Sequence, residues 1–406
     1  MTKLETLISQ LCPNGVEYKT LETVLKIKNG SDYKKFSSGD IPVYGSGGIM
    51  TYVDKYSYNK PSVLIPRKGS IDKLYYVETP FWNVDTIFYT EIDENVVIPR
   101  YVYHCLLKEH LEQYNTAGGV PSLTQGVLNK IKIPLPPMEV QHEIVRILDS
   151  FTELSAELSA ELSARKVQYE YYRDRLLSFN KTRGGNSCKL LDLLCQPITD
   201  GPHTTPTLVE NGIPFLSAEA VYDGRIHFEN KRGNITPEFD LECCKKYKPQ
   251  KHDVFMVKSG STTGKVGYVD TDERFNIWSP IAAMRVNEKN SSRYLFHLLQ
   301  TSEIQNQVRA KASHGSQPNL GMRALEQFDV VVPSLEEQIR IAEILDNFDA
   351  ICSDLKIGLP AEIEAREKQY GYYRDLLLSF NCSQSVNVER ERERERERES
   401  RSAPRG

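Results

Sequence analysis

The chain has 406 residues, of which 39% are hydrophobic and 26% are charged, and its formal net charge is −4. This length predicts two or three domains rather than one core. No apolar run approaches the roughly 20 residues of a membrane span, and the N-terminus lacks the layout of a signal peptide, so we expect a cytoplasmic globular protein. Nucleic-acid binding stays possible, because the acidic residues are concentrated in 139–180 and 335–381 and the other regions are close to neutral.

The eight cysteines and eight histidines form no metal-ligand spacing. No Cys-x-x-Cys or Cys-x-x-His pattern occurs, and the adjacent Cys243 and Cys244 cannot easily ligate one ion together. We expect reduced, mostly buried thiols and neither a bound metal nor a cofactor. His104 and His297 occupy matching positions on two predicted helices, where a hydrogen-bonded structural role is favoured.

Residues 1–137 predict a first mixed α/β domain. Short β-branched or aromatic runs bounded by Gly and Pro are typical of strands, and apolar residues three and four apart are typical of a helix. The predicted elements are strands over 61–66, 74–77, 84–89 and 131–136 and a helix over 101–114.

Residues 138–184 predict a spacer, with one long helix over 138–180. The tetrapeptide Ala-Glu-Leu-Ser is repeated in tandem around Leu154, Leu158 and Leu162, and leucines four apart form a stripe that drifts by about 40° per step. At about 1.5 Å per residue, the helix spans on the order of 60 Å. This length suits a spacer better than it suits a compact domain.

Residues 185–333 predict a second mixed α/β domain. The predicted elements are strands over 254–258, 267–269, 280–285 and 328–333 and a helix over 292–312. Segments 67–70 and 121–123 of the first domain are weakly similar to 258–261 and 318–320 of the second. The frame is shared while the surface residues differ, as two domains that read different sequences would require.

Residues 334–382 predict a second spacer helix, with a kink near 358–360. Gly358 is a natural C-terminal cap, and Pro360 is tolerated only where a new helix opens. The tail 383–406 alternates Glu and Arg over much of its length, which places like charges four residues apart in a helix. We expect this tail to be disordered.

One long segment occurs twice. The pattern Gln-Tyr-x-Tyr-Tyr-Arg-Asp within 168–180 returns within 369–381, and Ile-Leu-Asp-x-Phe occurs within 147–151 and within 344–348. The period is near half the chain, which predicts a duplicated molecule rather than a solenoid. Such a chain has a pseudo-two-fold axis and suits a two-part target such as duplex DNA.

Motifs for chemistry on DNA are absent from the sequence. There is no Asn/Asp-Pro-Pro-aromatic loop for a flipped base, and segment 259–266 departs from a phosphate-binding loop at two defining positions. Three hypotheses remain: a DNA-sequence reader that assembles with an enzyme, a solitary methyltransferase or nuclease, and a coiled-coil scaffold without a DNA role. The Gly-rich domains disfavour the third, and the missing motifs disfavour the second.

Polar, Gly-rich loops with basic residues are the predicted DNA contacts. Glycine lets the backbone approach phosphate, Lys and Arg neutralise it, and Asn, Gln, Ser and Arg can read base edges. The candidates are Lys26, Lys28, Asn29, Lys34, Lys35, Ser46, Arg67, Lys68 and Ser70 in the first domain, and His203, Thr204, Lys231, Arg232, Lys258, Ser259, Ser261, Thr262, Ser316 and Gln317 in the second.

With its two dissimilar domains, its repeat and its long helices, the chain resembles the specificity subunits of type I restriction–modification systems. The resemblance covers essentially residues 1–382. It rests on the repeated motifs, on segment 358–366 and on the tandem Ala-Glu-Leu-Ser block, which is similar to the tetrapeptide spacers of one branch of the family. The Glu-Arg tail departs from the family pattern.

The resemblance implies an α+β fold with two target recognition domains separated by two long helices that pack as an antiparallel coiled coil. Each domain would read one half of a split site in double-stranded DNA. The helices would set the spacing and dock two methyltransferase subunits, and restriction subunits would join later; the chain itself would hold no catalytic centre. The residues assigned to spacing and docking are Leu154, Leu158, Leu162, Tyr171, Tyr172, Arg173, Tyr372, Tyr373 and Arg374.

Overall fold

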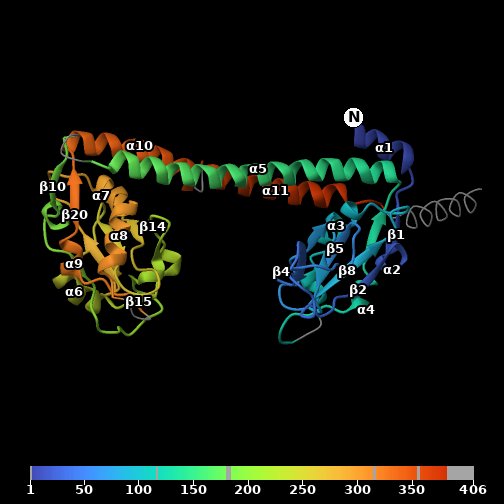
Figure 1. Ribbon diagram of the computed structural model, residues 1–406, viewed down its shortest axis with the longest axis horizontal. Helices are drawn as coiled ribbons and strands as arrows, with labels where there is room; N and C mark the ends of the chain where they lie inside the picture. Colours follow the sequence, from blue (N-terminus) through green and yellow to red (C-terminus); the bar gives the residue numbers. More distant parts are fainter. Residues whose placement is uncertain (1, 116–117, 180–183, 314–316, 354–356, 382–406) are drawn as a thin grey trace, which may run out of the picture. The chain divides into compact units, whose positions relative to one another are not determined.

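The computed structural model describes residues 2–115, 118–179, 184–313, 317–353 and 357–381. The chain divides into two compact units, one made of residues 1–157 with 363–406 and the other of residues 158–362. We call the globular part of the first unit domain 1 and that of the second unit domain 2 (Figure 1). The expected disordered tail lies outside the described residues.

Domain 1 combines strands with short helices, in agreement with the predicted mixed fold. Its strands are β1 (Glu17–Thr20), β2 (Leu25–Asn29), β3 (Ile41–Gly45), β4 (Gly48–Val53), β5 (Ser62–Pro66), β6 (Tyr75–Val77), β7 (Trp82–Asn83), β8 (Ile87–Ile92) and β9 (Lys132–Leu135). Its helices are α1 (Lys3–Leu11), α2 (Leu21–Val24), α3 (Pro99–Lys108), the 3-10 helix η1 (Leu111–Tyr114) and α4 (Gln125–Leu128).

Domain 2 repeats this arrangement with some insertions. Its strands are β10 (Asn186–Lys189), β11 (Thr199–Asp200), β12 (Ile213–Leu216), β13 (Val221–Tyr222), β14 (Arg225–Ile226), β15 (Gly233–Ile235), β16 (Val254–Val257), β17 (Val266–Tyr268), β18 (Asn276–Ile277), β19 (Ile281–Met284) and β20 (Asp329–Val332). Its helices are the 3-10 helices η3 (Leu190–Leu193), η4 (Ala218–Ala220) and η5 (Phe228–Asn230) and the α-helices α6 (Pro237–Lys246), α7 (Ser292–Leu299), α8 (Ser302–Lys311) and α9 (Met322–Glu326).

The two domains share one sheet topology. The four-stranded sheet β2-β8-β5-β6 of domain 1 corresponds to β11-β19-β16-β17 of domain 2. The three-stranded sheet β4-β3-β7 corresponds to β15-β12-β18, and the antiparallel pair β1-β9 corresponds to β10-β20. The central strands β5 and β16 are buried along their whole length, as their apolar runs require. The weak similarity between the two regions therefore reflects a common fold.

Two predicted helices are each broken in the structure. The run 101–114 divides into α3 and η1 because His110 takes a left-handed backbone conformation, with φ at 47°. The run 292–312 divides into α7 and α8, where the Thr301 hydroxyl accepts a hydrogen bond from the Ile304 amide and caps the second helix. Apolar periodicity predicted the helical character but not these turns.

The long helix is α5 (Met138–Leu177), which begins in one unit and ends in the other. It stops three residues short of the expected end, and Phe179 instead packs against the core of domain 2. The second segment forms α10 (Leu335–Ser353) and α11 (Leu359–Leu377). Pro360 lies in the first turn of α11, where a missing N–H costs little.

In each unit, α5 packs antiparallel against a helix from the second half of the chain. In unit 1, Phe151 of α5 stacks on Tyr373 of α11, with ring centroids 5.2 Å apart. In unit 2, Tyr169 of α5 stacks on Phe348 of α10, with centroids 6.0 Å apart. The Phe of each Ile-Leu-Asp-x-Phe motif therefore contacts a Tyr of the other repeat.

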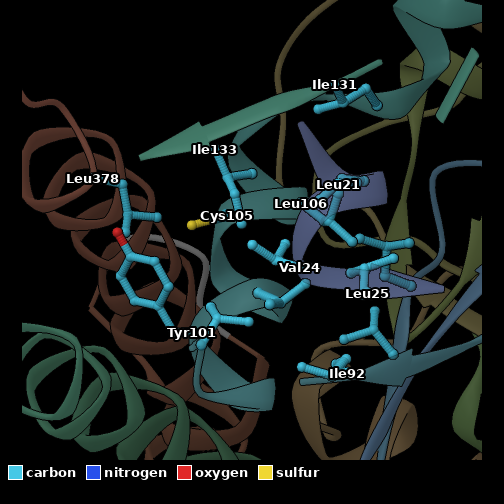
Figure 2. Close-up of a cluster of buried hydrophobic side chains, with 14 of the residues drawn as sticks. Leu21, Val24, Leu25, Ile92, Tyr101, Cys105, Leu106, Ile131, Ile133 and Leu378 are labelled. Atoms are coloured by element: carbon cyan, nitrogen blue, oxygen red, sulfur yellow. The ribbon is translucent and has the colours of Figure 1, made fainter. Parts of the chain in front are cut away.

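The end of the second repeat completes the core of domain 1. Leu378, just beyond α11, is fully buried against side chains from α3 and β9, such as Cys105 and Ile133 (Figure 2). The Lys108 ammonium donates to the Leu378 carbonyl at 3.0 Å, and the Val16 amide donates to the Asn381 carbonyl at 3.0 Å. Domain 1 is therefore assembled from both ends of the chain.

A buried polar cluster joins domain 1 to the helices. His104 of α3 is fully buried; its Nε2 lies 2.8 Å from the Asp149 carboxylate and its Nδ1 lies 2.9 Å from the Tyr370 hydroxyl. Arg100 Nε also donates to Asp149, at 2.8 Å. Burial lowers the pKa of His104, so the ring is neutral, donates to Asp149 and accepts from Tyr370.

Domain 2 has the same cluster with the helices exchanged. His297 of α7 is fully buried, with Nε2 2.6 Å from the Asp346 carboxylate and Nδ1 2.9 Å from the Tyr169 hydroxyl. Arg293 Nε donates to Asp346 at 2.9 Å. Burial lowers the pKa of His297 as well. The structural role expected for both histidines is confirmed, and the first Tyr of each repeated motif is the residue that holds the domain.

A glutamine at the start of each repeated segment connects the domain to the helix by hydrogen bonds. The Gln141 amide oxygen accepts from the Ile98 amide at 2.9 Å, and its nitrogen donates to the Pro136 carbonyl at 2.8 Å. Gln338 makes the equivalent bonds to Ser291 and Pro333, each at 3.0 Å. Both side chains are buried, so their polar groups must be satisfied internally.

Candidate nucleic-acid interface

Both domains carry a glycine turn directly after the central buried strand. Gly69 follows β5 with φ at 81°, and Gly260 follows β16 with φ at 102°, a backbone region that favours glycine. The Gly69 amide donates to the Pro121 carbonyl and the Gly260 amide to the Pro318 carbonyl, each at 3.0 Å. The two turns are structurally equivalent, and the space beside each glycine is open: a Cβ built there would meet only the Ser46 hydroxyl oxygen at Gly69 and no atom within 4 Å at Gly260.

In domain 1 this turn presents basic and hydroxyl side chains together. Lys68 is exposed, while Arg67 and Ser70 are half-buried. Among the described residues, no carboxylate pairs with Arg67, whose guanidinium lies 5.8 Å from the ring centroid of Phe88. Ser46 belongs to the same cluster, because its hydroxyl oxygen would lie 3.7 Å from a Cβ built on Gly69.

The end of β2 lies at the same end of the sheet as this turn. Asn29 pairs with Phe88, and Phe88 pairs with Ile65 two residues before Arg67. Asn29 is exposed, so the structure brings it toward the turn residues as a further polar group.

The other lysines predicted in domain 1 are exposed but less closely grouped. Lys26 and Lys28 alternate along β2, and Lys28 Nζ lies 3.7 Å from the Glu91 carboxylate. Lys34 and Lys35 belong to the segment between β2 and β3.

In domain 2 the basic residue of the turn lies inside the protein. Lys258 is 9% exposed, and its ammonium lies 3.3 Å from the carboxylate of Asp200, which is fully buried. Strand pairing makes Lys258 the counterpart of Arg67 and Asp200 the counterpart of Asn29. A buried, paired lysine does not present its charge to a ligand, so Lys258 is not a DNA contact of this surface.

The remaining turn residues of domain 2 are polar and accessible. Ser261 and Gln317 are exposed, and Ser259 and Thr262 are half-buried. An isolated bridge pairs Ser259 with Asn319, as another pairs Lys68 with Ser122 in domain 1. Ser316 lies outside the described residues.

Two further groups of predicted contacts lie elsewhere in domain 2. His203 and Thr204 are exposed on the loop after β11, where His203 Nε2 lies 3.4 Å from Asp200. Lys231 and Arg232 are exposed between η5 and β15. The Arg232 guanidinium lies over the Trp278 ring, 3.9 Å from its centroid, a geometry that pre-orients the side chain.

The residues predicted for spacing and docking divide by burial. Leu154, Leu158 and Leu162 are half-buried along α5. The adjacent tyrosines are exposed in both repeats, Tyr171 by 56%, Tyr172 by 42%, Tyr372 by 65% and Tyr373 by 39%.

Within each tyrosine pair the ring centroids lie 5.3 Å apart in an edge-to-face arrangement. Arg173 is buried over Tyr169 and paired with Asp174, so it is a structural residue rather than a free docking group. The half-buried Arg374 lies over Tyr370 in the same way.

The roles of two groups of residues are not visible in the sequence. Tyr169 and Tyr370 belong to the repeated motif, but only the fold shows that they reach His297 and His104. Asp200 carried no signal, because an isolated Asp-Gly pair is ordinarily a surface turn. Lining up Asp200 with Asn29 would have required the strand register.

Two classes of site find no support in the described part of the chain. No group of three or more His, Cys, Asp or Glu side chains there could hold a metal ion. None of its helices is long and apolar enough to cross a membrane.

Comparison with protein families gives a consistent assignment. The family model of the type I restriction modification DNA specificity domain matches residues 13–165 and again residues 202–365. The chain is 31% identical to a putative type I restriction enzyme specificity subunit of Haemophilus influenzae, over 90% of this chain and 96% of that protein. It is 35% identical to the EcoR124I/EcoR124II specificity subunit of Escherichia coli, over 73% and 75% of the two chains.

Solved structures share the fold at low sequence identity. A subunit from a study of assembly and conformational transition in the type I system superposes with a TM-score of 0.58 at 16% identity, covering 90% of this chain and 97% of its own. The S subunit of M. genitalium gives 0.53 at 14% identity, covering 90% and 96%. The family model, the relatives and the fold agree, and the chain belongs to the specificity subunits of type I restriction–modification systems.

Proposed function

We propose that domain 1 and domain 2 each read one half of a bipartite site in double-stranded DNA. Two domains of one fold carry different residues at equivalent positions. Arg67 is half-buried and pairs with no carboxylate of the described residues, whereas its counterpart Lys258 is buried against Asp200. A shared frame with unlike readers suits a target whose two halves differ in sequence. This pairing of equal folds with unequal surfaces is the observation that carries the proposal.

The glycine turn and its neighbours form the proposed contact surface of domain 1. Unpaired cations neutralise phosphate, while Arg and Asn can contact base edges. In domain 2 the proposed contacts are His203 and Thr204, the accessible turn residues Ser261 and Gln317, and the pre-oriented Arg232.

The exposed tyrosine pairs are the proposed docking sites for two methyltransferase subunits. Large exposed aromatic side chains are typical of protein interfaces. The pairs Tyr171–Tyr172 and Tyr372–Tyr373 have the same ring geometry, which suits two copies of one partner. In this proposal modification and cleavage belong to the partner subunits, restriction subunits join the assembled complex, and the chain acts in the cytoplasm without a catalytic centre of its own.

The helix α5 is the proposed ruler between the half-sites. Deleting one Ala-Glu-Leu-Ser unit shortens a helix by about 6 Å and rotates the rest of that helix by about 40°. A base-pair step is about 3.4 Å. We expect the unspecified gap in the target to change by a base pair or two while both half-sites keep their sequence.

The experiment replaces the gene at its own locus and maps modified bases in the chromosome. The wild-type map should show one bipartite motif that disappears when the gene is deleted. The shortened variant should show the same halves at a new separation, and an unchanged gap would refute the role of α5 as a ruler. Methylation by the purified chain alone would instead identify a solitary enzyme.

A further inference from the structure

Asp200 of domain 2 is a buried carboxylate surrounded by basic side chains. It is fully buried at the end of β11, yet it contacts the ammonium groups of Lys246 and Lys258 and the imidazole of His203. These three residues come from α6, from the turn after β16 and from the loop after β11. One carboxylate therefore lies within ion-pair distance of side chains from three separate segments of the domain, and Lys246 donates a hydrogen bond to it.

The same cluster ties down the start of the loop after β11. Lys246 Nζ also donates to the Gly201 carbonyl at 3.3 Å. A Cβ on Gly201 would lie 1.8 Å from the Ile277 carbonyl oxygen, so only glycine fits at this close approach. The chain then leaves the interior, and His203, Thr204 and Thr205 are exposed.

The basic side chains around Asp200 differ in how far they are exposed. Lys258 is nearly enclosed, whereas the side chains of Lys246 and His203 remain 47% and 72% exposed. A single carboxylate can balance only one of the two lysines, so positive charge remains at the accessible side. That is the side from which the exposed loop emerges.

Domain 1 lacks this arrangement although its backbone is equivalent. Asn29 stands where domain 2 has Asp200, and Arg67 stands where it has Lys258. A neutral side chain does not hold a cation in the interior, and Asn29 is exposed. Domain 1 also has no helix between β4 and β5 corresponding to α6, which supplies Lys246.

We propose that Asp200 is a positioning residue for recognition of the second half-site. Its carboxylate draws Lys258 inward, which converts the turn shared by both domains into an internal anchor. It also fixes the loop 201–205, so that His203 and Thr204 take over the contact with DNA that Arg67 makes in domain 1. The inference rests on the proposed function and deepens it.

The decisive variant is Asp200→Asn, made at the locus and read out by mapping modified bases. Asparagine keeps the size of the side chain but removes the charge that holds the loop. We expect modification at sites mismatched in one half to rise about tenfold relative to intact sites. The same ratio for the other half-site should not change.

Asp253→Asn is the matched control. Asp253 is equally buried, lies at the other end of β16 and accepts hydrogen bonds from Arg285 at 2.7 Å. The substitution weakens a buried ion pair in the same domain, and the other groups that donate to Asp253, the Tyr247 hydroxyl and the Gln250 amide, lie outside the loop 201–205. If Asp253→Asn relaxes the same half-site to the same extent, Asp200 is merely structural and the proposal is overturned.

His203→Ala keeps the proposal testable should Asp200→Asn fail to fold. His203 is 72% exposed, so its removal should not unfold the domain. We expect sequence discrimination to fall at the half-site that Asp200→Asn relaxes, and to stay unchanged at the half-site affected by Arg67→Met. An unaltered map for His203→Ala would exclude the loop as a contact.

The same maps distinguish a failure of the proposed function from a failure of the role of Asp200. Absence of any gene-dependent bipartite motif in the wild type would sink the proposed function. A bipartite motif that Asp200→Asn leaves equally strict in both halves would sink only the role of Asp200.

Discussion

Domain 1 and domain 2 attach to the long helices in the same way, but they expose different side chains at the glycine turn. Each attaches to the helices through a buried histidine, an aspartate from the first part of one repeat and a tyrosine from the end of the other. At the glycine turn, by contrast, no carboxylate of the described residues pairs with Arg67 in one domain, whereas Lys258 is buried with its ammonium 3.3 Å from the Asp200 carboxylate in the other. Attachment is duplicated while the exposed surface is not.

The difference shows that one fold can change its reading surface without changing its frame. A buried polar cluster tolerates little change, because each removed partner leaves another group unsatisfied. An exposed side chain carries no such penalty, and a substitution of Asn by Asp can redirect a neighbouring cation. The parts of the chain that resemble each other most are therefore those that join the domains to the helices.

The largest expected effect comes from breaking the shared attachment. His297→Ala leaves Asp346 and Tyr169 without their buried partner and opens a cavity, which should destabilise unit 2 by about 3 kcal/mol. His104→Ala should do the same in unit 1. Hydrogen exchange resolved along the chain measures both, and equal loss of protection in the two units from one substitution would contradict independent attachment.

A second test contrasts the two equivalent basic residues. Arg67→Met should weaken discrimination at one half-site by about 10- to 100-fold with little change in thermal stability, because it removes a proposed contact with DNA. Lys258→Met should mainly lower the melting temperature of domain 2, because it removes a cation from a buried pair. Mapping modified bases and calorimetry give the two readouts, and a reversed pattern would exclude the assigned roles.

Lowering the pH should destabilise both units, and it should destabilise unit 1 more than unit 2. Burial lowers the pKa of His104 and of His297, so each stabilises its unit fully above the ordinary value of about 6.5 and loses this contribution as the pH falls. Unit 1 also contains Glu143, whose pKa is lowered to about 2 by hydrogen bonds from Arg146 and Lys3.

The Glu143 contribution is present above about pH 4.5 and is lost as the pH falls toward 2. Its counterpart in unit 2 is Arg340, which pairs with Glu337 on the surface. Melting measured from pH 7 to pH 3 should show the extra loss in unit 1, and Glu143→Gln should abolish it. An acid response of equal size in the two units would contradict this assignment.

The smallest expected effect is the loss of one hydroxyl. Tyr169→Phe and Tyr370→Phe each remove a single hydrogen bond to a buried histidine and keep the packing, at a cost of about 1 kcal/mol. The two values should agree within error, because the bonded distances are the same at 2.9 Å. Denaturant titrations give the comparison, with the exposed Tyr372→Phe as a control that should be neutral.

Much of the organisation could be predicted from the sequence because it depends on local pattern. Apolar runs that end at proline marked β9 and β20, periodic leucines marked α5, and Gly358 with Pro360 marked the start of α11. The predicted helix ends were less accurate, because the Thr301 cap and the conformation of His110 are set by single residues.

The candidate site could be predicted only in outline. Glycine and basic residues marked the loops, but exposure depends on partners that are distant in the sequence. In the sequence Lys258 is indistinguishable from Arg67 as a candidate contact. The fold places Asp200, which is 58 positions away in the numbering, beside Lys258. Arg173 looked like a docking residue until the packing of α5 buried it over Tyr169.

The sequence by itself determined the duplication, the mixed α/β character of the two domains and the long helix, because repeats and periodicity are written in adjacent residues. Only the tertiary structure decided that the first tyrosine of each Gln-Tyr-x-Tyr-Tyr motif serves the domain from the other part of the chain, with Tyr370 on His104 and Tyr169 on His297. It also decided which cations face outward. A hydrogen bond or an ion pair depends on distances of a few ångströms, which the fold sets between residues that the sequence keeps far apart.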